Sequence, residues 1–180
     1  LEEFPQPAVV DADALNALAQ AGMPAPRGLR VLTPHPGEMA RLLAGNSRFK
    51  GERPGDEANP GSGLRERIER DRIGSALSFS KETGTYLILK GVPTVIAEPG
   101  GRVFLNSTGN PGMATAGAGD VLTGIVGSFV GQGLSPLDAA LLGVYMHGLA
   151  GDIAAEEKGM AALIASDLID ALPAAFKAMR

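Results

Sequence analysis

The stretch AVVDADALNALAQAG, residues 8–22, decides the class of fold, because it joins a short apolar strand to a helix through a turn with two carboxylates. The stretch GLRVLTPHPGEMARLLAG, residues 28–45, repeats this design with a strand at 29–32 and a turn marked by prolines, and Gly45 ends its helix. Consecutive strand–helix units favour helices packed on a mostly parallel sheet. The sequence therefore predicts an α/β fold.

The next segments continue this alternation. Apolar spacing over residues 64–84 predicts one helix, in which the charged run RERIERDR, residues 65–72, forms a solvated face. TYLILK, residues 85–90, is typical of a buried strand, while PTVIA, residues 93–97, and RVFL, residues 102–105, predict a hairpin around EPGG. The residues expected near the common face of the helix are Leu64, Ile68, Ile73, Leu77 and Ser80.

The C-terminal third is predicted to be helical. Apolar spacing indicates a helix over about residues 120–131 and a longer one through Leu137–Ile153. A last helix is expected to be capped by Ser166 or Asp167 and to end near Phe176. Between the helices at 28–45 and 64–84, the Gly-, Pro- and Asn-rich residues 45–63 predict a flexible surface loop, for which an insertion is favoured over a lid.

Length and composition restrict the class of protein. The 180 residues suit one domain, 1–180, and the formal net charge of −4 gives no electrostatic attraction to nucleic acid or anionic lipid. The chain has no cysteine, which excludes disulfides, thiolate metal sites and cysteine nucleophiles. No apolar stretch reaches the roughly 18 residues of a membrane span. We therefore expect a cytoplasmic protein with no nucleic-acid or membrane partner.

Ligands of open α/β sheets bind at the carboxyl ends of the strands. The informative loops are therefore DAD (11–13), TPHPGE (33–38), KGVPT (90–94) and GNPGMATAGAGD (109–120). In the last of these, Gly117, Ala118 and Gly119 precede a helix, and their backbone N–H groups with the helix N-terminus are suited to hold phosphate as an anion hole.

Asp120 follows the glycines at the start of that helix. A carboxylate beside bound phosphate is placed to take the proton from a hydroxyl that attacks phosphorus. For GAGD alone, a glycine-rich turn with Asp120 as a simple capping residue is equally expected. Neither the Walker spacing nor a dinucleotide G-x-G-x-x-G after a strand is present, so another phosphate architecture is required.

The other loops carry weaker signals. In TPHPGE, His35 is suited to donate to a ligand and Glu38 to orient water or magnesium-bound water, or Pro36 and Glu38 merely start a helix. Lys90 is a cation suited to a nucleotide's phosphate or ribose edge, although a lysine that ends a strand is commonplace. Of the remaining groups, Asp11 and Asp13 are candidate carboxylates with Asp13 as a helix cap, and His147 is expected to pack between helices.

Four motifs, taken together and in order, resemble the ribokinase-like superfamily and, within it, the ADP- or ATP-dependent NAD(P)H-hydrate dehydratases. They are VVDADALN (9–16), VLTPHPGEMARLL (31–43), LKGVPTVIA (89–97) and GNPGMATAGAGDVLTGI (109–125). The resemblance implies a three-layer αβα ribokinase-like fold with a mostly parallel central sheet. It also implies an enzyme that phosphorylates the ring hydroxyl of hydrated NADH or NADPH, with ADP or ATP as donor and Mg²⁺, and releases phosphate to restore the dihydronicotinamide.

The resemblance also assigns roles to residues of the four loops. Asp120 would be the base, and Gly117, Ala118 and Gly119 would stabilise the transferred phosphoryl group. His35, Asn110 and Asp120 would contact the hydrated dinucleotide, and Glu38 would hold magnesium through water. The expected adenine-nucleotide contacts are Lys90, Gly91, Val92, Pro93, Thr94 and Gly119.

Two departures from the family pattern concern residue 118 and the beginning of the chain. Ala118 stands where the family usually has threonine, which removes a hydroxyl near the anion hole and is closer to the kinases. Relatives carry further β-α units before the strand at 8–10, so the resemblance predicts an N-terminally incomplete domain with poor or no activity on its own. The alternatives are a ribokinase-like vitamin or sugar kinase and a non-catalytic nucleotide-binding remnant. Relatives are often homo-oligomers, which makes an oligomer an expectation here.

Overall fold

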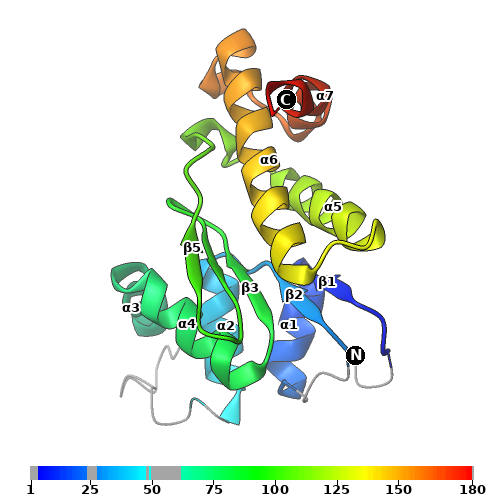
Figure 1. Cartoon of the computed structure of the whole chain (residues 1–180). Coiled ribbons are helices and arrows are strands. Elements are labelled where there is room, and N and C mark those ends of the chain that lie inside the picture. Colours follow the sequence, from blue (N-terminus) through cyan, green and yellow to red (C-terminus); the bar gives the residue numbers. More distant parts are fainter. Residues whose placement is uncertain (1–3, 24–27, 48, 50–61, 180) are drawn as a thin grey trace. The chain divides into compact units, whose positions relative to one another are not determined.

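The computed structural model describes residues 4–23, 28–47, 49 and 62–179. Its contacts divide the chain into two compact units, unit 1 with Leu1–Leu105 and unit 2 with Asn106–Arg180, which Figure 1 colours from blue to green and from green to red. The expectation of one domain over 1–180 stays a prediction. Most of the expected loop at 45–63, namely residues 48 and 50–61, lies outside the described residues.

Unit 1 contains a sheet of 5 strands in the order β1-β2-β3-β4-β5. The first three strands pair in parallel, and β3–β4 and β4–β5 pair antiparallel. The sheet of the described residues is therefore mixed, and the expected mostly parallel character holds only for β1, β2 and β3. The connections after β3 and β4 are too short for the crossover that parallel pairing needs. The bounds are β1 (Ala8–Val10), β2 (Arg30–Leu32), β3 (Tyr86–Leu89), β4 (Val95–Ala97) and β5 (Val103–Leu105).

Unit 1 also contains four helices, which share an apolar core with the sheet. They are α1 (Ala12–Ala21), α2 (Pro36–Gly45), α3 (Ser62–Arg70) and α4 (Arg72–Thr83). Their apolar side chains form one core with alternate strand residues, so the short strands are held by burial on this face rather than by their length. The largest fully buried members of that core are Phe79, Leu15, Leu32, Met39, Leu42, Leu64, Ile68, Leu87 and Leu89.

The helix expected over 64–84 is two helices, α3 and α4, so this prediction is wrong in part. Asp71 interrupts it, because its Oδ1 accepts the N–H of Gly74 at 2.8 Å and starts α4 as a new helix. The break changes which residues face the core: Ala76, Phe79, Ser80 and Thr83 are buried in α4, whereas Ile73 is 47% exposed. Aspartate is a preferred N-cap residue, so the sequence did contain a signal for this boundary.

The start of α1 also differs from the expectation, since Asp13 lies inside the helix and does not cap it. Asp11 occupies the N-cap position but makes no side-chain hydrogen bond to the helix. The next residue, Ala12, has φ +50°, a left-handed conformation that a non-glycine residue rarely adopts. The side chain of Asp11 instead contacts the Nζ of Lys90.

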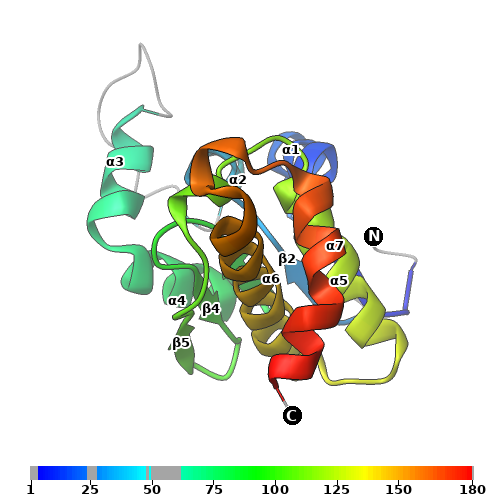
Figure 2. The same cartoon turned by 90° about the horizontal axis from the view of Figure 1, so that it is seen from above.

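Unit 2 is helical throughout its regular elements. It comprises η2 (Pro111–Met113), α5 (Ala118–Gly131), α6 (Pro136–Lys158), η3 (Met160–Ala162) and α7 (Ala165–Ala178). Figure 2 shows α5, α6 and α7 alongside one another, and these three helices contact each other pairwise. A Cβ on Gly143 of α6 would lie 2.6 Å from a methyl of Val126 in α5, so the glycine permits this close approach.

The start of α7 corrects one predicted cap. Ile164 is the N-cap residue, and Asp167, at the third helical position, accepts the Ile164 N–H at 3.0 Å through Oδ2. Asp167 thus satisfies the helix end from inside, and Ser166 does not cap it. Because Lys158 also donates to Asp167, the pKa of this carboxyl lies below its ordinary value.

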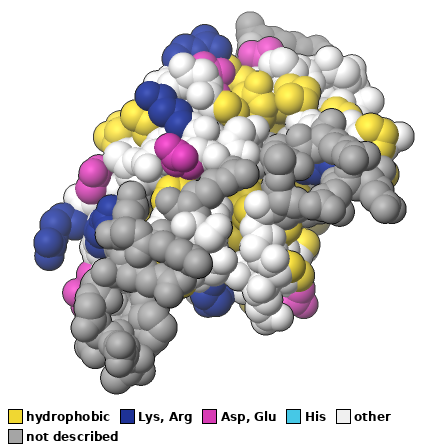
Figure 3. Space-filling model, turned by 90° about the horizontal axis from the view of Figure 1, so that it is seen from below, with side chains coloured by type: hydrophobic (Ala, Val, Ile, Leu, Met, Phe, Trp, Pro, Cys, Tyr) yellow, Lys and Arg dark blue, Asp and Glu magenta, His cyan; other side chains and the backbone are white. Residues whose placement is uncertain are grey.

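The surface agrees with the modest net charge of the chain. On the face drawn in Figure 3, described basic and acidic side chains are interspersed and form no extended basic patch. None of the helices in the described ranges combines the length and apolar character that crossing a bilayer would require.

Candidate functional site

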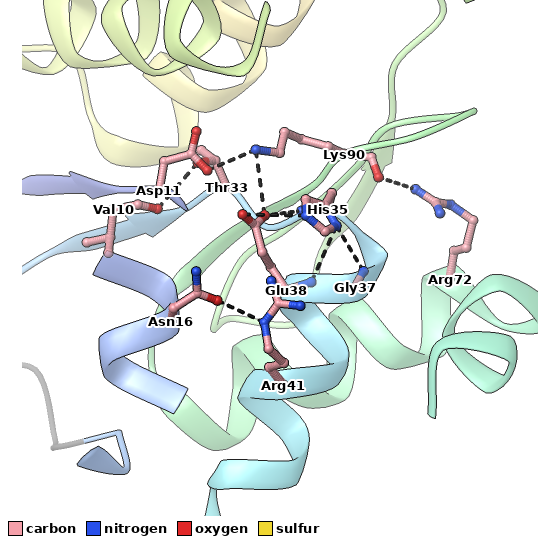
Figure 4. Close-up of polar contacts among 10 residues, drawn as sticks. All are labelled: Val10, Asp11, Asn16, Thr33, His35, Gly37, Glu38, Arg41, Arg72 and Lys90. Carbon is pink, nitrogen blue, oxygen red and sulfur yellow. Dashed lines mark hydrogen bonds and ion pairs between the residues drawn. The ribbon is translucent and has the colours of Figure 1, made fainter. Parts of the chain in front are cut away.

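The carboxyl ends of β1, β2 and β3 bring three of the predicted loops of unit 1 together. Since β2 lies between β1 and β3 and all three run in parallel, the residues that follow them share one edge of the sheet. Figure 4 shows the side chains of Asp11, Glu38 and Lys90 converging there. Three of the four informative loops therefore lie at one edge of the sheet.

Lys90 is the centre of this cluster. Its Nζ lies 2.8 Å from Asp11 Oδ1 and 3.8 Å from Glu38 Oε2. The side chains of Asp11 and Glu38 are each only 8% exposed and that of Lys90 21% exposed, so all three charges are largely withdrawn from solvent. Two carboxylates thus share one ammonium, which leaves the cluster with a net negative charge before any ligand binds.

Main-chain bonds fix the loop that follows β2. Thr33 is fully buried, and both its N–H and its hydroxyl donate to the carbonyl of Val10, at 3.1 and 3.3 Å. The N–H of Lys90 donates to the Pro34 carbonyl at 2.8 Å. The parallel pairing therefore continues past the strand ends, and it holds the backbone of Lys90 against the loop that carries His35.

His35 caps α2 with its ring. Its Nδ1 accepts the N–H groups of Gly37 at 3.0 Å and Glu38 at 3.4 Å, while Glu38 Oε2 accepts the His35 N–H at 2.8 Å. Because Nδ1 is an acceptor, we assign the ring proton of the neutral imidazole to Nε2. Burial lowers the pKa of His35, and nearby Glu38 offsets this only in part. His35 is thus a neutral donor through Nε2–H, and its side chain is 51% exposed.

Glu38 has a structural role that the sequence left open. It is the third residue of α2, and its carboxylate completes a capping box with His35. The helix-start interpretation of Pro36 and Glu38 is therefore correct for this geometry. Among the described residues, no group of three or more His, Asp or Glu side chains is arranged as a metal site, so a water-mediated role of Glu38 toward magnesium stays a prediction.

Arg72 is a residue of this region that sequence reasoning missed. Its Nη2 donates to the carbonyls of Leu89, Lys90 and Pro93 at 3.2, 3.0 and 3.2 Å. The side chain is only 10% exposed, so the assignment of the whole run 65–72 to a solvated face is wrong at its last residue. Nothing local in the sequence marks this contact, because its partners lie up to 21 residues further along the chain.

In unit 2, the glycine segment forms the start of α5 as expected. Gly117 is the N-cap residue in a left-handed conformation, φ +86°, and it provides no side-chain acceptor for the first-turn N–H groups. Asp120 lies in that first turn with its side chain exposed. Backbone donors at an N-terminus without a side-chain cap are suited to an anion. The N–H of Ala118 already donates to the Thr115 carbonyl at 3.3 Å, and the anion hole of Gly117, Ala118 and Gly119 stays a prediction.

Asn110 is engaged in holding the loop before η2. Its Nδ2 donates to the Gly151 carbonyl at 3.0 Å and to Asp152 Oδ1 at 2.9 Å, and its Oδ1 accepts the Gly112 N–H at 3.0 Å. Asp152 Oδ2 also accepts the Gly109 N–H at 2.8 Å. Sequence reasoning missed Asp152, and the proposed contact of Asn110 with a substrate stays a prediction.

His147 links two helices of unit 2. Its Nε2 lies 2.9 Å from the carbonyl of Ala118 in the first turn of α5. This contact agrees with the expected packing role and fixes α6 against the helix start that carries Asp120.

Comparison with known proteins identifies the family. The family model described as NAD(P)H-hydrate dehydratase matches residues 1–174. A bifunctional NAD(P)H-hydrate repair enzyme of Moorella thermoacetica is 52% identical over 169 residues, which cover 93% of this chain and 28% of that protein. An ADP-dependent (S)-NAD(P)H-hydrate dehydratase of Neisseria meningitidis is 37% identical over 175 residues, which cover 94% of this chain and 53% of that protein.

Solved structures give the same family and the fold. The crystal structure of an ADP/ATP-dependent NAD(P)H-hydrate dehydratase from Bacillus subtilis, co-crystallised with ATP/Mg²⁺, matches with a TM-score of 0.79 and 32% identity over 97% of this chain and 55% of that chain. A ribokinase-like superfamily protein from Enterococcus faecalis matches with a TM-score of 0.71 and 28% identity over 94% of this chain and 52% of that chain. The predicted α/β class and ribokinase-like fold are therefore confirmed.

The chain spans about half the length of the Neisseria enzyme and less than a third of the Moorella protein. Within that span the order of the four motifs, the family model and the fold agree. The chain belongs to the NAD(P)H-hydrate dehydratase family.

Proposed function

We propose that this chain carries out the ADP- or ATP-dependent dehydration of hydrated NADH or NADPH. The observation that carries the proposal is the family match over residues 1–174, within which both the strand-end cluster of unit 1 and the glycine-capped start of α5 occur. The Bacillus structure was co-crystallised with ATP/Mg²⁺, which supports an adenine nucleotide with Mg²⁺ as the phosphoryl donor.

The chemistry begins at Asp120. Its carboxylate takes the proton of the ring hydroxyl while that oxygen attacks the terminal phosphorus of the nucleotide, and AMP or ADP leaves. The N–H groups of Gly117 to Gly119 stabilise the charge on the transferred group. The carbon–oxygen bond then breaks with phosphate as leaving group, a neighbouring ring carbon loses a proton, and the ring double bond is restored.

Residues at the strand ends have binding roles in this proposal. The stretch Lys90–Thr94 with Gly119 holds the adenine nucleotide, and His35 donates its Nε2–H to the hydrated dinucleotide, with Asn110 as a further contact. Bound Mg²⁺ supplies positive charge to the phosphates, and Glu38 is proposed to hold it through water. Lys90 is proposed to contact a phosphate, and its ammonium offsets part of the repulsion that the carboxylates of Asp11 and Glu38 exert on an anion.

The kinase alternative has one observation in its favour, the alanine at position 118 in the GAGD run. A vitamin or sugar kinase would use the same base and anion hole but leave a stable phosphorylated product. A nucleotide-binding module without catalysis would bind nucleotide and turn nothing over. We further propose a cytoplasmic protein that acts on small molecules, without nucleic-acid or membrane partners, and that forms a homo-oligomer.

The test uses the product of the full reading frame that encodes these residues. It is incubated with Mg²⁺, hydrated NADPH or NADH, and ADP or ATP, and the absorbance of the dihydronicotinamide is followed. The absorbance should rise only with nucleotide present and in proportion to the AMP or ADP formed. No rise with any combination sinks the dehydratase assignment, and a stable phosphorylated alcohol from another substrate indicates the kinase.

A further inference from the structure

The loop between β3 and β4 accepts three hydrogen bonds from one guanidinium. Arg72 is the first residue of α4, and its Nη2 reaches the carbonyl oxygens of Leu89, Lys90 and Pro93 at 3.0 to 3.2 Å. Figure 4 shows Lys90 with its carbonyl bonded to Arg72 and its Nζ to Asp11 at the opposite end of the residue. One arginine therefore gathers acceptors from both ends of the stretch 90–93.

The approach of this side chain is unusually close. A Cβ on Gly91 would lie 2.5 Å from Nη2, and the φ of Gly91 is +144°. Glycine at this position thus gives the guanidinium space beneath the loop. The other terminal nitrogen, Nη1, pairs with Glu69 at 2.8 Å, and Glu69 is 46% exposed.

The orientation of the carbonyls determines what the loop offers a ligand. In a planar trans peptide the C=O and the following N–H point in opposite directions. Bonds from Arg72 to the carbonyls of Lys90 and Pro93 therefore turn the N–H groups of Gly91 and Thr94 away from the guanidinium. Carbonyl oxygens repel an anionic ligand and N–H groups attract it, so this orientation favours phosphate or ribose oxygens on the outer side of the loop.

We propose that Arg72 is a positioning residue for adenine-nucleotide binding, which acts by holding the carbonyls of Leu89, Lys90 and Pro93 away from the nucleotide. The inference rests on the proposed role of Lys90–Thr94 in the dehydratase reaction. Arg72 itself does not touch the nucleotide in this proposal. Its effect should therefore appear in nucleotide affinity, and not in the affinity for the hydrated dinucleotide.

The test compares Arg72→Gln and Arg72→Lys with two controls in the full chain. Glu69→Gln removes the ion pair to Nη1 but leaves the three carbonyl bonds, and Arg70→Gln removes the same charge from an exposed neighbour. Arg72→Gln should raise the Kd for ADP about tenfold, because the charge-assisted bonds that order the loop are lost. Arg72→Lys should recover part of this loss, since an ammonium still donates to carbonyls, and both controls should stay within twofold of the wild type.

Two further readouts separate positioning from a general loss of structure. The KM for the nucleotide should rise in Arg72→Gln while the KM for the hydrated dinucleotide is unchanged. Hydrogen exchange of the Lys90 amide, which is bonded to the Pro34 carbonyl, should become faster in Arg72→Gln without nucleotide and not in Glu69→Gln. Equal nucleotide affinity in Arg72→Gln and wild type would overturn the inference, as would an equal fall in affinity for both substrates.

Nucleotide binding by the wild-type chain tests the proposed function independently of the Arg72 variants. If the wild type binds neither ADP nor ATP, the proposed role of Lys90–Thr94 fails. The hydrogen-exchange comparison then decides the Arg72 inference alone: unchanged exchange at Lys90 overturns it, and faster exchange supports the positioning of the loop by Arg72.

Discussion

Asp11 and Lys90, 79 residues apart in the sequence, form an ion pair of 2.8 Å across the end of β2. Asp11 stands at the N-cap of α1, where a carboxylate commonly bonds the first-turn N–H groups, yet it makes no such bond. The carboxylate accepts a hydrogen bond from Lys90 instead. The ends of β1 and β3 are thereby joined, and the helix start gives up its side-chain cap.

Removing this carboxylate should weaken both the fold and the nucleotide site. Asp11→Asn removes the charge that pairs with Lys90 and leaves an amide oxygen as a weaker acceptor, so we expect the free energy of unfolding of the chain to fall by about 1–2 kcal/mol. Nucleotide affinity should also fall, because Lys90 loses its fixed position. Urea unfolding and ADP titration measure the two effects. In a double-mutant cycle with Lys90→Met, additive effects would contradict a direct coupling.

The left-handed conformation of Ala12 leads us to expect that a substitution at this position stabilises the chain. Ala12→Gly removes the steric cost of φ +50°, which exceeds the entropy that glycine adds to the unfolded state. The free energy of unfolding should therefore rise by about 0.5–1 kcal/mol. Ala14→Gly, inside the same helix, is the matched control and should be destabilising. A loss of stability in Ala12→Gly would show that this backbone carries no such strain.

His35 should make stability depend on pH in a definite direction. Burial lowers its pKa below 6.5, so at pH values between the folded and unfolded pKa the unfolded chain binds the extra proton. The contribution of His35 to the free energy of unfolding is fully present above its pKa in the unfolded chain. It is lost as the pH falls through its pKa in the folded chain. His35→Asn keeps an N-cap acceptor without titrating. Its unfolding free energy should fall less than that of the wild type between about pH 7 and pH 5.

Asp120 should be needed for turnover and not for nucleotide binding. Asp120→Asn keeps the helix start and its N–H groups but cannot accept the hydroxyl proton, so kcat should fall about 10³-fold. The Kd for ADP should change less than about threefold, because the backbone amides hold the phosphate. Stopped-flow absorbance and calorimetry give the two values. Retained turnover would remove Asp120 from the role of base.

Asn110 should contribute to stability whether or not it contacts a substrate. Asn110→Ala removes its bonds to Gly151, Asp152 and Gly112 and leaves the Asp152 carboxylate with one partner fewer. We expect the free energy of unfolding to fall by about 1–3 kcal/mol. Substrate contact predicts an additional rise in the KM for the hydrated dinucleotide at temperatures where the variant is fully folded. An unchanged KM would show that Asn110 only holds the loop and does not contact the substrate.

The sequence allowed the α/β class and the helix α5 to be predicted, because both depend on local signals. The predicted start near residue 120 was two residues late, since α5 begins at Ala118 inside GAGD. Period-two and period-3.6 apolar patterns with Gly and Pro turns place strands and helices, and parallel strand order then brings Asp11, His35 and Lys90 to one edge. The mixed character of the sheet followed from short connections that were visible as turn signals. Asp71 is a preferred N-cap residue, but the apolar spacing continues across it and by itself predicts a single helix.

The contacts that organise the site were not predictable in the same way. Arg72 reaches carbonyls up to 21 residues away, and Asp152 holds Gly109 from 43 residues further on. Such bonds depend on which helix packs beside which loop. The sequence around a charged residue does not indicate which distant loop that residue will contact. The capping ring of His35 shows the same limit, since histidine is not among the preferred N-cap residues.

The left-handed conformation of Gly117 has a consequence for how descendants of such a protein lose function. Any other residue at position 117 would have to adopt φ +86°, and its Cβ would lie 3.1 Å from the Cβ of Ala165. The fold itself therefore favours glycine at this position. A gene copy that had stopped binding phosphate would still keep this glycine for stability, while the exposed Asp120 would be free to drift. The aspartate, and not the glycine before it, is therefore the position whose replacement would reveal that catalysis has been abandoned.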